Sequence, residues 1–400
     1  MSTLEQLLDS RRVVVVVGSG GVGKTTSSAL FGLHAAIRGK RVLVMTIDPA
    51  RRLANALGVE GLDHDIEQID LEMFREFDVE PKGELWATML DMKSAFDSII
   101  ERHVTSEKER KQIYNNRFYH FFSTSLAGAQ ELSATDRLLD VVRSGRFDLV
   151  VLDTPPTTNA LDFLDAPKRF ADALDNDTIR WFIDAGRRAV KATNLVNVGA
   201  GMVIRTLGRF TGIDFFRELG EFLYHLNHVL VGFHDRAQET QDILMGDDAA
   251  FVIVTSPDPA TVREAQFFRE KLNEYDAKFG AIIVNRVRQL LSSDRTLQEN
   301  ASALHQELMT LAPSEMYGAS MTERLAEKLS KNARDFNGLA EMDAATIERL
   351  RAEFGGDVGL SQVPLYAHDI HSLKGLERVR RDLFGLSPLD DVLMSSPGED

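Results

Sequence analysis

Residues 13–26 combine an apolar run, a group of glycines and the start of a helix, and this order constrains the fold more than any other part of the chain. Val13–Val17 is a run of five valines, which is typical of a strand covered on both faces in a parallel sheet. Gly18–Thr26 reads Gly-Ser-Gly-Gly-Val-Gly-Lys-Thr-Thr. Glycines allow main-chain N–H groups to turn toward an anion, and a following helix N-terminus adds donors and a positive dipole end. The segment therefore predicts a strand, a phosphate-binding loop and a helix.

The loop fits the pattern G-x-x-x-x-G-K-[ST] of nucleotide-binding proteins. Lys24 is expected to reach the β- and γ-phosphates, and Thr25 to offer its hydroxyl to Mg²⁺. A glycine-rich turn without a ligand is the alternative, but the bare pattern arises by chance in on the order of 1% of chains this long. The expected nucleotide contacts are Gly20, Gly21, Val22, Gly23, Lys24, Thr25 and Thr26.

The composition argues against several other classes. The chain has 400 residues with 46 basic and 61 acidic side chains, a net charge of −15, so we expect no nucleic-acid binding through a basic surface. It has no cysteine, which excludes disulfides and thiolate metal sites and fits a cytoplasmic protein. The N-terminal residues do not resemble a signal peptide, and no run of about 18 uncharged apolar residues predicts a transmembrane segment.

Further apolar runs predict a doubly wound, mostly parallel α/β sheet, with ligands bound at the carboxyl ends of its strands. Helices are expected at Lys24–Arg38, ended by Gly39, and at Thr261–Glu274. The core strands expected after Val13–Val17 are Arg41–Ile47, Phe147–Leu152, Ala250–Thr255, Phe279–Asn285 and Leu360–Leu365.

Long helical stretches separate these strands, so we expect one nucleotide-binding domain with an inserted helical subdomain. Large apolar residues are frequent in the middle stretch; they could form its core, a groove for an apolar helix of a client, or a surface against a dimer partner. Core pieces are expected at approximately 10–70, 146–160, 247–286 and 356–386, and helical insertions at approximately 71–145, 161–246 and 287–355.

Three polar residues follow expected strands. Asp48 could orient or deprotonate an attacking water, although a simple Asp-Pro turn explains it equally well. Asp153 ends an apolar strand and would hold Mg²⁺ through water, whereas an N-cap is the alternative. The Asn285 amide presents a donor and an acceptor, which suits an adenine edge, but a turn residue is the simpler interpretation. Arg51 and Arg52 could offset phosphate charge.

Taken in order, these motifs resemble the family that contains the arsenical pump-driving ATPase and the ATPase that targets tail-anchored membrane proteins. The resemblance extends over most of the chain. The residues that carry it are Gly18–Thr25, Asp48-Pro49-Ala50 with Leu53, Asp153-Thr154 with Pro156, Thr157 and Leu161, Asn285, and Pro364-Leu365 with Ile370, Gly375 and Leu376.

The resemblance implies a dimeric, Mg²⁺-dependent ATPase in which ATP binding and hydrolysis open and close a helical client-binding subdomain. The client would be an apolar helix or a membrane-protein segment, and the dimer partner a second copy or a related ATPase chain. The implied roles are catalysis by Lys24 and Asp48, Mg²⁺ binding by Thr25 and Asp153, and adenine contacts by Asn285, Pro364 and Leu365.

The chain departs from the family at several points. Ser19 stands where a lysine that reaches across the dimer is usual, and Asn159 where a histidine is usual. The cysteines that bind zinc between targeting-ATPase subunits, or arsenite in the pump ATPase, are absent. Ser19 leaves open a nucleotide-gated binding or regulatory subunit with little hydrolysis, acting in a heterodimer. The energising subunit of an anion pump that does not use cysteine-bound arsenite is a further alternative.

Overall fold

The structure of the chain is a computed structural model. It describes residues 3–47, 52–59, 65–77, 79–90, 92–125, 129–155, 218–219, 222, 235–291, 306–307, 310, 319–355, 359–367, 370 and 373–386.

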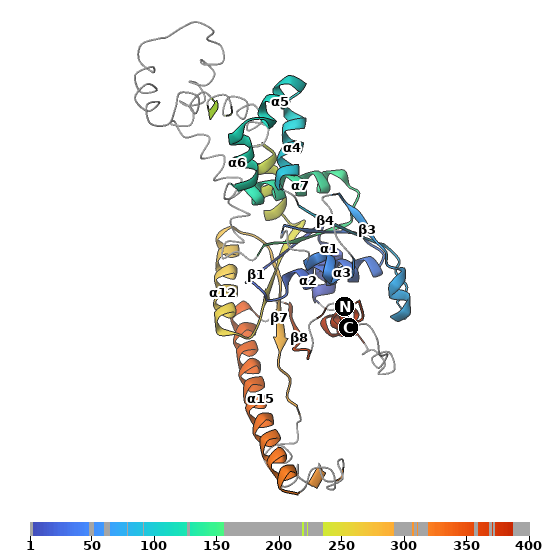
Figure 1. The fold of residues 1–400 in the computed structure, drawn as a ribbon, viewed down its shortest axis with the longest axis vertical. Helices are drawn as coiled ribbons and strands as arrows, with labels where there is room; N and C mark the ends of the chain where they lie inside the picture. Colours follow the sequence, from blue (N-terminus) through green and yellow to red (C-terminus); the bar gives the residue numbers. More distant parts are fainter. Residues whose placement is uncertain are drawn as a thin grey trace, which may run out of the picture.

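A sheet of eight strands forms the centre of this described part, in the order β3-β4-β2-β5-β1-β6-β7-β8 (Figure 1). Every neighbouring pair is parallel except β3 and β4, which are antiparallel. The mostly parallel α/β fold that the sequence predicts is therefore confirmed. The strands are β1 (Val13–Gly18), β2 (Arg41–Thr46), β3 (Glu67–Ile69), β4 (Glu84–Met89), β5 (Leu149–Asp153), β6 (Ala249–Thr255), β7 (Phe279–Val287) and β8 (Gly359–Pro364).

Helices cover both faces of the sheet, which explains the unbroken valine run of β1. Val14 and Val16 face one core cluster, together with apolar residues of α2 and α16. Val13, Val15 and Val17 face the other cluster, with residues of α7, α12 and α15. The helices are α1 (Thr3–Ser10), α2 (Lys24–Ile37), α3 (Arg52–Leu57), α4 (Met92–His103), α5 (Glu107–Tyr114), α6 (Arg117–Ser125), α7 (Ala129–Ser144), α12 (Pro259–Glu274), α15 (Ala319–Phe354) and α16 (Leu373–Phe384), with a 3₁₀ turn at Glu72–Phe77.

The expected core strands and the two expected core helices are all present, with ends shifted by at most two residues. Gly39, which follows α2, has a φ of 107°, so it supplies the expected helix stop. Figure 1 shows α4, α5 and α6 at one end of the molecule and the N-terminal end of α15 at the other. No helix within the described ranges is both long enough and apolar enough to cross a membrane.

The expected helical insertion at 71–145 is wrong over its first part. Strand β4 lies inside it and pairs with β2. On its other side β4 pairs with the antiparallel β3, which forms the edge of the sheet. The sequence of β4, Glu-Leu-Trp-Ala-Thr-Met, lacks the valine and isoleucine that mark the other core strands, so helical periodicity extends over it. Helices of the insertion begin only with α4.

Candidate active site

The glycine-rich loop connects the carboxyl end of β1 to the N-terminus of α2, as predicted. Gly18, Gly21 and Gly23 have φ values of 151°, 76° and 100°, which L side chains rarely adopt. A Cβ atom on Gly18 would lie 2.1 Å from the main-chain oxygen of Val254 in β6. Glycine is therefore required where the loop leaves the sheet, both by conformation and by the close approach of a neighbouring strand.

Lys24 folds back over the loop from the first turn of α2. Its side chain is buried, and Nζ donates hydrogen bonds to the main-chain oxygens of Gly18 at 2.9 Å and Ser19 at 2.8 Å. The ammonium group thus lies inside the curve of the loop, at a helix N-terminus. A buried cation next to N-terminal helix N–H groups favours an anion such as a phosphate.

Asp153 lies beneath the loop and accepts hydrogen bonds from three hydroxyl groups, two of them in α2 and one in β2. Its carboxylate is fully buried and accepts hydrogen bonds from Thr25 at 2.8 Å, Thr46 at 2.9 Å and Ser28 at 3.5 Å. Strand order produces this arrangement, because β5 lies between β1 and β2 and Asp153 is level with Val16 and Thr46. The predicted pair of Thr25 and Asp153 is thereby brought together.

Thr46 and Ser28 were not identified from the sequence. Thr46 is the last residue of β2, so a hydroxyl at a strand end beside the loop was the available signal. Ser28 lies one turn after Lys24 in α2 and also donates to the Lys24 main-chain oxygen. A serine making such an i−4 bond looks like an ordinary helix residue, so only the position of β5 reveals its approach to Asp153.

The donor set around Thr25 and Asp153 fits Mg²⁺. A hydroxyl and a carboxylate are oxygen ligands of the kind that Mg²⁺ prefers, and it usually takes only one or two from the protein, with phosphates and waters completing the shell. No group of three or more metal-binding side chains occurs among the residues that the structure describes. The arrangement is thus suited to an ion that arrives with a nucleotide.

Asn285 lies against the loop from the end of β7. Its Nδ2 donates to the main-chain oxygen of Val22 at 2.8 Å, and its Oδ1 accepts from the Arg286 N–H at 2.8 Å. Arg286 has a φ of 60°, and the pairing of β7 with β8 shifts register between Val284 and Val287. This irregularity turns Asn285 from the strand ladder toward the loop. A Cβ on Gly23 would lie 2.3 Å from Asn285 Nδ2, so the contact is close.

Pro364 and Leu365 lie at the same edge of the sheet. Pro364 is level with Val287 of β7, and the Leu365 N–H donates to the Val287 oxygen at 2.9 Å. The Leu365 side chain is exposed. The carboxyl ends of β1, β5, β7 and β8 therefore bring together the loop, Asp153, Asn285 and Pro364.

Ser19 makes a contact that the sequence did not suggest. Its buried Oγ donates a hydrogen bond to Oε2 of Glu264 in α12. Thr154 makes a similar link, since its Oγ1 donates to the Val16 oxygen at 2.8 Å. The Ser19 hydroxyl thus connects the loop to α12, and the Thr154 hydroxyl connects the segment after β5 to β1.

His34 holds the rear of α2 against α16. Its buried ring stacks on Phe384 with centroids 3.6 Å apart, and Arg380 Nη1 lies 3.3 Å from Nδ1. Burial and the positive charge of Arg380 lower the pKa of His34 to about 4, although Glu5 lies 3.4 Å from Nε2 and opposes this. The imidazole is therefore neutral at pH 7, and its contact with Glu5 is not a salt bridge.

Arg380 in turn forms two hydrogen bonds with fully buried Glu377, at 2.6 and 2.7 Å. This bidentate ion pair carries the guanidinium charge next to His34. The helix that begins at the loop is thus fixed at its far end by the C-terminal helix of the described part.

Several predicted residues lie outside the described residues. These are Asp48, Pro49, Ala50, Arg51, Pro156, Thr157, Asn159 and Leu161, with most of the apolar stretch at 161–246. Leu53, by contrast, is buried in α3.

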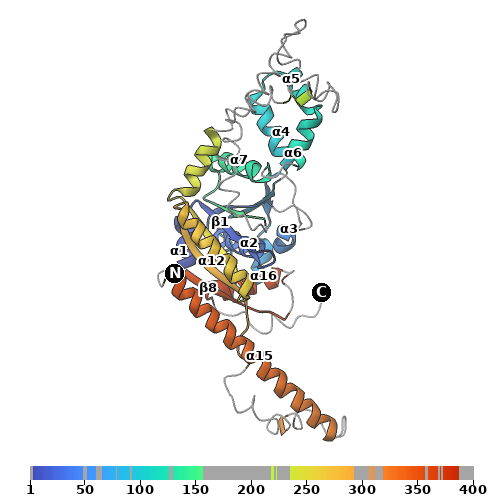
Figure 2. The same cartoon turned by 90° about the vertical axis from the view of Figure 1, so that its left-hand side faces the viewer.

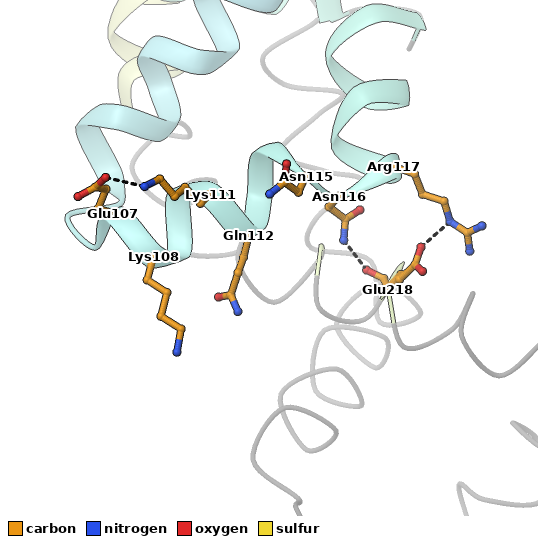
Figure 3. Close-up of a pocket in the computed structure, with 8 residues that line it drawn as sticks. All are labelled: Glu107, Lys108, Lys111, Gln112, Asn115, Asn116, Arg117 and Glu218. Atoms are coloured by element: carbon orange, nitrogen blue, oxygen red, sulfur yellow. Dashed lines mark hydrogen bonds and ion pairs between the residues drawn. The ribbon is translucent and has the colours of Figure 1, made fainter.

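A cavity of about 900 Å³ lies between α5, the start of α6 and Glu218. Figure 3 shows its polar lining, in which Lys111 pairs with Glu107 at 2.9 Å and Arg117 pairs with Glu218 at 2.6 Å. Its cations are largely neutralised, and its walls offer no buried charged group. The loop edge of the sheet remains the candidate active site.

Several known proteins are similar to this chain. The family model described as anion-transporting ATPase matches residues 11–310. "Putative arsenical pump-driving ATPase 1" of Aquifex aeolicus is 25% identical over 314 residues, covering 74% of this chain and 68% of that protein. ATPase GET3 of Podospora anserina is 23% identical over 288 residues, covering 71% and 76%. ATPase get3 of Schizosaccharomyces japonicus is 30% identical over a shorter stretch of 175 residues, covering 43% and 49%.

Proposed function

The chain belongs to the anion-transporting ATPase family, and we propose that it is a Mg²⁺-dependent ATPase whose ATP binding and hydrolysis open and close a helical client-binding subdomain. One observation carries the ATPase part of this proposal. Thr25 at the start of α2 donates to the buried carboxylate of Asp153, directly beneath a loop that encloses the Lys24 ammonium. The Lys24 ammonium, which can bind phosphates, thus lies next to the Thr25 and Asp153 oxygens, which can bind Mg²⁺.

Each residue has a proposed task. Lys24 would exchange the oxygens of Gly18 and Ser19 for phosphate oxygens, and Thr25 and Asp153 would hold Mg²⁺. When bound, Mg²⁺ neutralises charge on the phosphates. Asp48 orients the attacking water.

The adenine end of the site is proposed at Asn285, Pro364 and Leu365. Asn285 and Pro364 lie at the ends of the neighbouring strands β7 and β8, so a base placed there would be next to the loop. The exposed Leu365 side chain supplies an apolar surface of the kind that covers a base.

The connection to a client runs through the segment that leaves β5. Asp153 is the last residue of β5, and Thr154 is tied to β1 through Val16. A change in the partners of Asp153 therefore acts at the start of the chain that enters the apolar stretch at 161–246. Transitions of this kind, driven by the γ-phosphate, are common in nucleotide switches. We propose an apolar helix or membrane-protein segment as client, a cytoplasmic location, and a homodimer or a heterodimer with a related ATPase chain.

The contact of Ser19 with Glu264 favours a second candidate. It places a carboxylate beside the loop, where negative charge opposes a triphosphate. A nucleotide-gated binding or regulatory subunit with little hydrolysis, acting in a heterodimer, would tolerate this. An energising role in an anion pump is a third candidate, for which the description of the family model provides support.

Phosphate release from ATP by the purified full chain separates these candidates. If the chain is an ATPase, its phosphate release should depend on Mg²⁺. Lys24→Ala should lose both ATP binding and phosphate release. Asp48→Asn should lose phosphate release but still bind ATP. Tight ATP binding without turnover, even at high protein concentration, would instead support the regulatory subunit. Absence of ATP binding by the wild-type chain would overturn both.

A further inference from the structure

Helix α15 extends far beyond the body of the molecule (Figures 1 and 2). Its last turns are anchored, because Ile347, Leu350 and Phe354 belong to the core cluster on one face of the sheet. The preceding turns carry a series of exposed apolar side chains, with Met321 60% and Met342 65% exposed. An exposed apolar series of this length on a projecting helix requires explanation, because isolated apolar side chains are common on surfaces but aligned ones are not.

The exposed residues of α15 include a regular heptad pattern. Positions spaced alternately by four and three residues lie along one narrow face of an α-helix and form the contact line of coiled coils. We call this line the α15 seam. All of its members are exposed: Met321, Leu325, Lys328, Asn332, Asp335, Leu339 and Met342.

The α15 seam has the same order of residue types from either end. Methionine and leucine stand at each end and Asn332 stands at the centre. Only the charged positions differ, with Lys328 on one side of Asn332 and Asp335 on the other. A parallel pair of such helices would place lysine against lysine and aspartate against aspartate. An antiparallel pair places the methionine and leucine of one end against those of the other end. It also brings Lys328 of each helix within reach of Asp335 of the other helix.

We propose that the α15 seam is the docking surface for a second copy of this chain, arranged antiparallel about a two-fold axis near Asn332. A two-fold contact uses the same patch on both copies, and the seam is complementary to itself only in this direction. Leu329 and Phe336 follow Lys328 and Asp335 directly, so apolar side chains flank both charged positions. Polar residues within such a contact fix its register at some cost in affinity.

This contact does not depend on the nucleotide site. The members of the seam all lie in residues 321–342, whereas the site described above lies at the ends of β1, β5, β7 and β8. The proposal therefore stands or fails separately from the ATPase proposal. An amphipathic helix of a client would also cover the apolar ends, but it would not require opposite charges at Lys328 and Asp335.

Light scattering of the full chain without nucleotide, over a range of concentrations, tests the charge pattern. Lys328→Asp or Asp335→Lys alone should weaken the dimer at least about tenfold, because each creates two like-charge contacts. The double variant Lys328→Asp/Asp335→Lys should restore it. Arg334→Glu is the matched control, since Arg334 is exposed but lies off the seam. Lys24→Ala should dimerise like the wild type, even if it loses ATP binding.

Cross-linking tests the direction of the helices. The chain has no cysteine, so introduced cysteines react alone. At a rise of about 1.5 Å per residue, copies of position 321 would lie roughly 30 Å apart in the antiparallel pair. Met321→Cys alone should then not cross-link, whereas an equal mixture of Met321→Cys and Met342→Cys should form a disulfide.

Three results would overturn the docking proposal. They are a monomer at every concentration, a dimer unaffected by Lys328→Asp, and efficient cross-linking of Met321→Cys to itself. A monomer that binds an amphipathic peptide through the seam would assign this face to a client. Circular dichroism of each variant checks that the helix content of the chain is unchanged.

Discussion

The hydroxyl of Thr25 donates a hydrogen bond of 2.8 Å to the carboxylate of Asp153, although the two residues lie 128 positions apart in the chain. The bond joins the start of α2 to the end of β5 and defines the proposed Mg²⁺ position. Asp153 has no exposed surface, so its charge acts on this position and on the neighbouring hydroxyls.

Asp153→Asn should raise the Mg²⁺ concentration needed for half-maximal phosphate release by about 10- to 100-fold, the usual effect of removing a group that supports a metal indirectly. Asparagine keeps the shape and an oxygen that can accept from Thr25, so folding should be retained. A Mg²⁺ titration of ATPase activity measures the effect. Thr46→Val removes a donor to Asp153 but no charge, and should shift the midpoint less. An unchanged midpoint in Asp153→Asn would remove Asp153 from the metal site.

Gly18→Ala should lower the free energy of unfolding by about 3 kcal/mol, because a Cβ would meet the Val254 oxygen at 2.1 Å in a backbone conformation unsuited to alanine. Gly21 provides the control. Its φ is also positive, but a Cβ there meets no atom within 4 Å, so Gly21→Ala should cost only about 1 kcal/mol. Urea denaturation of both variants measures the difference. Equal losses would mean that conformation alone determines the use of glycine in the loop.

Asn285→Ala should weaken ATP binding about tenfold, because it removes the hydrogen bond of Nδ2 to Val22. Comparing ATP with inosine triphosphate shows how the loss arises. If Asn285 acts by holding the loop, both nucleotides should lose affinity equally. A loss confined to ATP would show that the amide recognises the adenine edge. Retention of full affinity for both would contradict either role.

Acidification should destabilise the protein through His34. The pKa of His34 is 6.5 in the unfolded chain and about 4 in the folded protein. As the pH falls, the unfolded state therefore binds the extra proton before the folded state does. The stability contributed by neutral His34 is complete above pH 6.5 and is lost as the pH falls toward 4. Between pH 7 and 5 this loss amounts to about 2 kcal/mol. Urea denaturation at both pH values should show a smaller decrease in His34→Gln than in the wild type. An equal decrease would assign the acid sensitivity to other groups.

The core of the fold could be predicted from sequence because its strands are distinct. β1, β5 and β6 are almost entirely apolar, and such runs can be recognised as strands from the sequence alone. β4 was missed because its alanine, threonine and tryptophan give no comparable signal. Its position was settled by pairing with β2, and long-range pairing is not encoded in local periodicity.

The candidate site was predictable to the extent that it follows from motifs. Lys24, Thr25, Asp153 and Asn285 stand at loop and strand ends that motif order indicates. The contacts of Asn285 with Val22 and of Ser19 with Glu264 could not be foreseen, because they depend on how β7 and α12 lie against the loop. The roles of all these residues, and of Asp48, Pro364 and Leu365, remain predictions.

The central position of β1 has a consequence for synthesis on the ribosome. β1 lies between β5 and β6, whose residues leave the ribosome long after the phosphate loop. At about 5–20 residues per second, β6 is completed roughly ten to fifty seconds after β1. A nascent run of five valines therefore lacks both neighbours until β5 is made and still lacks β6 after that. We expect the growing chain to need protection from aggregation during this interval, and the nucleotide to stabilise it only after β6 has emerged.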